Sequence, residues 1–153
     1  TPLSRNSIIA QKYFALLSLT TFLGFIFFSS ISIGAIVINM DISILNITNI
    51  SIHLALLGSV FGCLSFFIGS MTGVKSYSIG IPAAGALISY LLNAFSSSIT
   101  LFDTLKYLSP FYYYIDRNPL IHGFSPWNTI ALISIVLTLG LLSLFTFKKR
   151  NLT

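Results

Sequence analysis

Four long apolar runs, separated by short polar breaks, constrain this chain more than any other feature. They cover residues 13–40, 53–73, 79–99 and 127–147. A helix needs about 20 apolar residues to cross a hydrocarbon core about 30 Å thick. Each run is long enough, so the sequence predicts an all-α, polytopic membrane bundle with four transmembrane helices. The first run is longer than a bilayer requires, so we expect its helix to tilt or to extend into the cytoplasm.

The composition leaves almost no material for a water-facing surface. Only 7% of the 153 residues are charged and 55% are hydrophobic, whereas soluble domains carry about 25% charged residues. Residues 1–153 are therefore expected to form a single transmembrane domain without a separate soluble domain. The net charge of +5 comes from basic residues at the ends of the runs, not from a basic patch. Nucleic acid is thus not an expected partner, and the lipid bilayer is.

The distribution of charge predicts the topology. If both termini are cytoplasmic, the basic residues that lie inside are Arg5, Lys12, Lys75, Lys148, Lys149 and Arg150. Those outside are only Lys106 and Arg117, together with all three acidic residues, Asp41, Asp103 and Asp116. This is a clear positive-inside bias. The chain is therefore predicted to be a multi-pass protein of the cell membrane with both termini in the cytoplasm.

Small residues of the second run fall on one face of the predicted helix. They are Gly58, Gly62, Ser65, Gly69 and Gly73, and at 100° per residue they lie within about 80° of one another. Small residues let helices approach closely in lipid, so this stripe is predicted to be a helix-packing seam. The sequence leaves open whether the seam faces this chain or a second subunit. Cys63, in the same run, is expected to be a small buried side chain because it has no partner cysteine.

The stretch 100–126 is too broken to span a membrane and unusually aromatic. Its rings belong at a membrane–water boundary, and Ser109 before Pro110 predicts a helix N-cap. We expect one or two short helices in the outer leaflet, or dipping into it. The candidate outer-gate residues are Ser109, Pro110, Phe111, Tyr112, Tyr113, Tyr114 and Gly123. The alternative is an amphipathic loop that only anchors the chain.

Several smaller expectations follow from local patterns. Residues 41–50 are expected to form a short outer loop, and Pro82 to lie near the first turn of the third helix, where a missing N–H costs little. His53 and His122 are expected as polar residues at outer helix ends, and a metal site that joins them to an outer aspartate is the less favoured alternative.

Signatures of catalysis are missing from the sequence. It contains no His-Glu-x-x-His pattern, no phosphate loop with correct spacing and no pair of acids within a membrane run. The chain is therefore not expected to be an enzyme, nor to bind a metal or a cofactor of its own.

Three segments resemble the permease of type-2 ATP-binding-cassette (ABC) transporters. Residues 1–12, TPLSRNSIIAQK, are similar to the family's cytoplasmic P-x-S-R…K stretch before its third span. Residues 108–114, LSPFYYY, with Asn118-Pro119-Leu120 and Gly123, are similar to its outer segment before the last span. Residues 145–152, FTFKKRNL, are similar to its ending, although Asn151 stands where the family often has Asp. Six spans are usual in the family, so the resemblance implies a C-terminal portion that lacks two N-terminal spans.

The resemblance implies partners and roles. Such a permease pairs with a second permease subunit, as a homodimer or heterodimer, and with cytoplasmic ATP-binding subunits that hold and hydrolyse the ATP. Residues 1–12 would form the coupling segment, with Arg5 and Lys12 either contacting the ATPase or only anchoring the topology. Residues 100–126 would cap the translocation path on the extracytoplasmic side. The alternatives are a non-transporting structural or assembly subunit and, ranked last, an intramembrane enzyme that uses His53 or His122.

Overall fold

The structure, a computed structural model, describes residues 5–116 and 118–149, with side chains from residue 7 onward, and all regular secondary structure in these residues is helical. The helices are α1 (Arg5–Val37), α2 (Ile44–Thr72), α3 (Lys75–Ala94), α4 (Thr100–Leu105), η1 (Lys106–Leu108), α5 (Pro110–Ile115), α6 (Pro119–His122) and α7 (Pro126–Lys149). Four of them, α1, α2, α3 and α7, are long and apolar enough to cross a membrane. The predicted four-span bundle with short helices before the last span is thus confirmed, and the chain is a multi-pass membrane protein.

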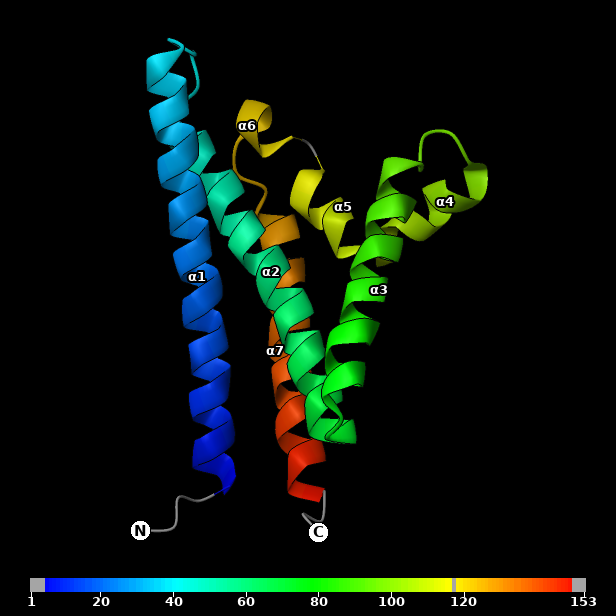
Figure 1. Cartoon of the computed structure of the whole chain (residues 1–153). Helices are drawn as coiled ribbons and strands as arrows, with labels where there is room; N and C mark the ends of the chain where they lie inside the picture. Colours follow the sequence, from blue (N-terminus) through cyan, green and yellow to red (C-terminus); the bar gives the residue numbers. More distant parts are fainter. Residues whose placement is uncertain (1–4, 117, 150–153) are drawn as a thin grey trace.

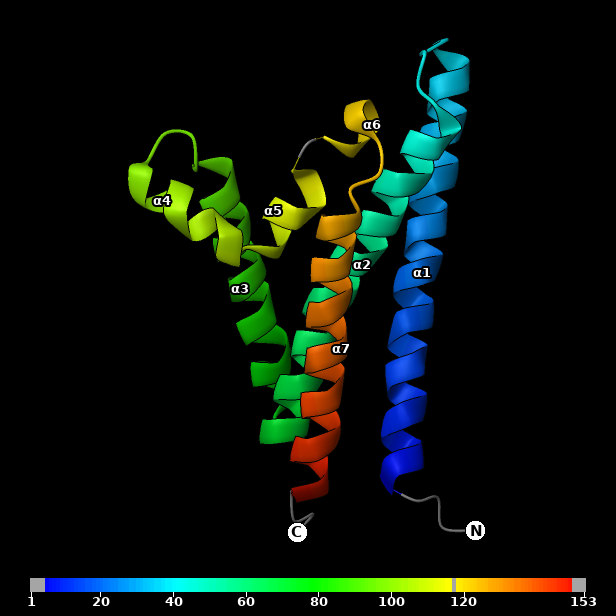
Figure 2. The ribbon, with the colours of Figure 1, turned by 180° about the vertical axis from the view of Figure 1, so that it is seen from behind.

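The long helices run side by side, with α2 in the centre of the bundle (Figure 1). The start of α1, the α2–α3 turn and the end of α7 lie at one end, which we call the terminal end (Figures 1 and 2). The α1–α2 connection and the short helices α4 to α6 lie at the opposite end, which we call the loop end. In both views α3 leans away from α1 toward the loop end, and α5 lies between α3 and α7.

The core lies where α1, α2 and α7 meet. Its buried residues are Val60 and Cys63 from α2 and Leu132 and Val136 from α7. Cys63 is fully buried, as expected for a small apolar side chain. A third of the most apolar part of α2 is buried (33%), against 6% in α1 and in α3. Most of the surface of α1 and α3 is therefore left to lipid or to another subunit.

The second helix begins earlier than the apolar pattern indicates. Residues 41–50 were expected to form a loop, but α2 starts at Ile44. Three polar side chains in the first turns of this helix form hydrogen bonds within the structure. Thr48 and Ser51 donate to the carbonyls of Ile44 and Ile47, and Asn46 donates to the carbonyl of Leu120 at 2.9 Å. Such bonds let polar residues continue a membrane helix.

Pro82 lies inside α3 and not in its first turn, because the helix begins seven residues earlier at Lys75. A proline in a helix interior has no N–H for the carbonyl four residues before it, which here belongs to Ser78. The Ser65 hydroxyl, on α2, donates to this same Ser78 carbonyl at 2.6 Å. A neighbouring helix thus supplies the donor that the proline lacks, which is how membrane helices accommodate proline.

Candidate functional site

The predicted glycine stripe of α2 faces two different helices of this chain. A Cβ on Gly62 would lie 3.0 Å from Leu16 of α1, whereas a Cβ on Gly69 would lie 2.9 Å from the Ser78 hydroxyl of α3. Gly58 is less crowded, because its Cβ would meet only Thr20, at 3.7 Å. Gly73 follows the last residue of α2 with φ 68°, and its N–H donates to the Gly69 carbonyl at 2.9 Å. It therefore ends the helix in a conformation that favours glycine.

Two of the tightest helix contacts involve glycines outside the stripe. A Cβ on Gly24 would lie 2.9 Å from the Ala55 Cβ and 3.2 Å from the Ser51 carbonyl oxygen, where α1 crosses α2. A Cβ on Gly140 of α7 would lie 2.6 Å from the Tyr13 hydroxyl of α1. Gly140 has no small residue four positions away, and Gly24 has only Thr20, so neither belongs to a longer stripe that the sequence would indicate.

Ser109 joins the outer segment to α3. Its hydroxyl accepts a hydrogen bond from the Phe111 N–H at 3.2 Å, so the predicted N-cap before Pro110 is confirmed. The same hydroxyl donates to the Ser89 carbonyl of α3 at 2.8 Å. The Phe111 ring then lies between Phe61 of α2 and Tyr90 of α3, with ring centroids 5.7 Å apart in each pair. The first turn of α5 is thus a wedge between two spans.

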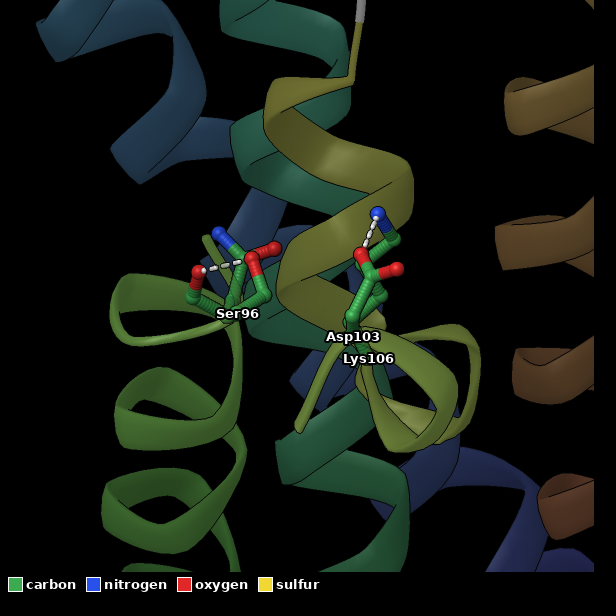
Figure 3. A network of polar contacts seen from close by, with 4 residues as sticks. Ser96, Asp103 and Lys106 are labelled. Carbon is green, nitrogen blue, oxygen red and sulfur yellow. Dashed lines mark hydrogen bonds and ion pairs between the residues drawn. The ribbon is translucent and has the colours of Figure 1, made fainter. Parts of the chain in front are cut away.

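Three tyrosine rings contact one another edge to face at the loop end. The Tyr112 ring lies 4.9 Å from Tyr107 and 5.3 Å from Tyr113 between centroids, and the Tyr113 hydroxyl donates to the Tyr107 carbonyl at 3.0 Å. The Lys106 ammonium lies over the Tyr107 and Tyr112 rings, 5.4 and 5.8 Å from their centroids. Figure 3 shows the ion pair that Lys106 forms with Asp103, and this hydrogen bond raises the pKa of Lys106. Burial raises the pKa of Tyr112 and of Tyr114.

An open cavity of about 770 Å³ lies beside these rings. Its lining comprises Tyr107, Tyr112, Tyr113, Asp116, His122, Gly123, Phe124, Ser125, Pro126, Trp127 and Asn128. The Asn128 amide lies 3.4 Å from the Asp116 carboxylate. Gly123 has φ 78°, and a Cβ there would lie 3.2 Å from the Asn46 side-chain oxygen. Aromatic rings beside a carboxylate and an amide can hold an amphipathic molecule at a membrane surface.

His53 is not at a helix end, as its sequence context suggests, but within α2, with 1% of its surface exposed. Its Nδ1 lies 2.8 Å from the Asn49 carbonyl oxygen, which only accepts, so Nδ1 carries a proton. Its Nε2 lies 3.1 Å from the Thr129 hydroxyl of α7, and that hydroxyl also lies 3.0 Å from the Ser125 carbonyl. His53 is thus a polar link between α2 and α7. His122, by contrast, ends α6 as expected.

Replacing Thr129 with valine should destabilise the bundle by about 1 kcal/mol, because the buried His53 ring loses its interhelical partner. Unfolding in mixed detergent micelles, followed by the fluorescence of Trp127, measures this change. Thr138→Val is the matched control on the same helix, since Thr138 is exposed and bonds only to its own helix, at the Ser134 carbonyl. Equal losses in the two variants would contradict a role for the His53–Thr129 contact.

Lys12 lines a cleft of about 440 Å³ at the terminal end, together with Gly73 and Lys75 at the α2–α3 turn. The predicted coupling residue therefore lies beside the turn that joins two other spans. Arg5 is the first residue of α1, and its side chain falls outside the described part of the structure, as do residues 1–4, Arg117 and residues 150–153. The topology and resemblance arguments that use these residues stay predictions.

We compared the chain with known protein families, curated proteins and solved structures. No family model, no curated protein and no solved structure matches the chain.

Proposed function

We propose that this chain is a membrane-spanning subunit of an ABC-type exporter, driven by ATP hydrolysis on a separate cytoplasmic subunit. The observation that carries the proposal is the position of Lys12. It shares one cleft with Gly73 and Lys75 at the α2–α3 turn. A protein that docks on this end would contact α1, α2 and α3 together, and it could move three spans at once.

The exposed apolar surface supports a second membrane subunit. On α1, Phe14, Phe22 and Phe25 are 60–66% exposed, and the most apolar part of α3 is no more buried than that of α1. Side chains fill the centre of the bundle around Cys63 and Leu132, both 0% exposed. A translocation path would therefore run between this chain and a partner subunit, and the outer segment at the loop end would cap it.

Co-purification tests the proposal directly. The complete protein should co-purify with a cytoplasmic ATPase encoded beside it, and Lys12→Gln should weaken that association by up to about fivefold, because one exposed ion pair is lost. The control is Lys106→Gln, which removes a lysine between α4 and α5 at the loop end and should leave the association unchanged. If no ATPase associates with the complete protein, the proposal is wrong.

Spin labels distinguish a transporter from a passive structural subunit. Gln11→Cys and Ser76→Cys place labels on exposed neighbours of the two cleft lysines, and the buried Cys63 does not compete for the label. With the ATPase bound, ATP should change the distance between the labels. No change on adding ATP would favour the structural subunit. The labelled chain without ATPase is the control, and it should not respond.

A further inference from the structure

The cleft at the terminal end carries two positively charged side chains. It is lined by all four long helices, through Lys12 of α1, Ser65 and Gly69 of α2, Lys75 and Ser78 of α3, and Phe147 of α7. Neither Lys12 nor Lys75 forms an ion pair within the described residues. The three acidic side chains of the chain belong to the other end, and one of them, Asp103, pairs there with Lys106. The two lysines thus face one cleft without a counter-charge.

The backbone adds to this positive potential. Helix α3 begins at Lys75, so the positive end of its dipole lies at the cleft. The N-cap, Val74, supplies no side-chain hydrogen bond, and the first turn contains no acidic residue. The hydroxyls of Ser65 and Ser78 donate to the carbonyls of Ser78 and Val74, which leaves the two ammonium groups as the main donors. An anion with several oxygens, such as a phosphate, would satisfy this arrangement.

An apolar groove adjoins the basic cleft. It has a volume of about 210 Å³, shares Ile9 and Phe66 with the cleft, and extends over Phe14 of α1 and Leu141 and Leu144 of α7. The groove lies along membrane-spanning helices, whereas Lys75 is the first residue of α3 and Lys12 immediately precedes the first apolar run. The basic cleft thus continues into an apolar groove. This combination fits the charged headgroup and the acyl chain of a lipid better than it fits a free anion.

We propose that this cleft binds the phosphate headgroup of an anionic phospholipid, with Lys12 and Lys75 holding the phosphate and an acyl chain lying in the apolar groove. Basic pockets between membrane helices are known to hold such headgroups. The proposal rests on the membrane fold and not on the exporter proposal. Both proposals use Lys12, but lipid binding is measured on the chain without an ATPase, so each can fail separately.

Native mass spectrometry of the purified chain in detergent, titrated with phosphatidylglycerol, tests the site. The double variant Lys12→Gln/Lys75→Gln should bind phosphatidylglycerol about thirtyfold more weakly, since each lysine near a lipid surface contributes about 1 kcal/mol. Phosphatidylcholine should bind the wild type and this variant equally. Lys12→Arg/Lys75→Arg keeps both charges and should retain binding, which guards against a loss caused by misfolding.

A control variant at the same end of the bundle distinguishes binding in the cleft from general electrostatic attraction of an anionic lipid. Lys148→Gln/Lys149→Gln removes two charges at the terminal end but outside the cleft, and it should change binding by less than about threefold. Equal losses in the two glutamine doubles would overturn the proposal. Inorganic phosphate and soluble glycerol phosphate are added as competitors. If either competitor displaces phosphatidylglycerol when it is present at about the same concentration as the lipid, the cleft recognises a free phosphate and the lipid assignment is wrong.

Discussion

Replacing Gly24 with alanine is expected to destabilise the bundle by about 1–3 kcal/mol, the usual cost of overpacking a tight interior contact. The new methyl group would lie 2.9 Å from the Ala55 Cβ and 3.2 Å from the Ser51 carbonyl oxygen. Both atoms are fixed to the backbone of α2, so no side-chain rotation can make room. The helices α1 and α2 would have to separate where they cross.

The matched control lies on the same helix. Gly34 is exposed, and a Cβ there would meet nothing within 4 Å. Gly34→Ala should therefore be neutral or stabilise the helix by up to about 1 kcal/mol, because alanine has the higher helix propensity. The two variants are compared by unfolding in mixed detergent micelles and by cross-linking between α1 and α2. If Gly24→Ala were as stable as Gly34→Ala, the close approach of the two helices would be wrong.

These glycines show which helix contacts can be predicted from the sequence and which cannot. Apolar run length predicts four spans because lipid imposes a minimum length on every crossing. A repeated spacing also identifies the α2 stripe, and Gly62 and Gly69 do lie against Leu16 and Ser78. Gly24 has Thr20 four positions before it but continues no longer stripe, so this reasoning does not single it out. Such a contact depends on where two helices cross, which is a property of the packed bundle.

Helix boundaries show the same limit. The loop predicted at residues 41–50 rests on the break between two apolar runs, but α2 continues through most of it. The side chains of Asn46 and Thr48 are hydrogen-bonded to the outer segment and to α2 itself. The Ser109 N-cap could be predicted, since its capping bond to Phe111 is local in sequence. The wedge of Phe111 between Phe61 and Tyr90 could not be, because it joins three segments far apart in the chain.

Replacing Ser65 with alanine should destabilise the bundle by about 1–2 kcal/mol. The Ser65 hydroxyl donates at 2.6 Å to the Ser78 carbonyl, the one that Pro82 leaves without its helical N–H donor. Without this hydroxyl, the Ser78 carbonyl would lack both its helical donor and the donor from α2. The loss is measured by unfolding in mixed micelles, as for Gly24→Ala.

A double-mutant cycle isolates the cause. Pro82→Ala restores an N–H to α3, and this N–H can donate to the Ser78 carbonyl without help from α2. Ser65→Ala should therefore cost little in the Pro82→Ala background, with a coupling energy of about 1 kcal/mol between the two positions. Ser70→Ala serves as the control, because Ser70 is also buried on α2 but donates to its own helix, at Phe66. It should show no coupling to Pro82. If Ser65→Ala cost the same with and without the proline, Ser65 would stabilise the bundle by packing alone. Its hydrogen bond to the Ser78 carbonyl would then not compensate for the N–H that Pro82 lacks.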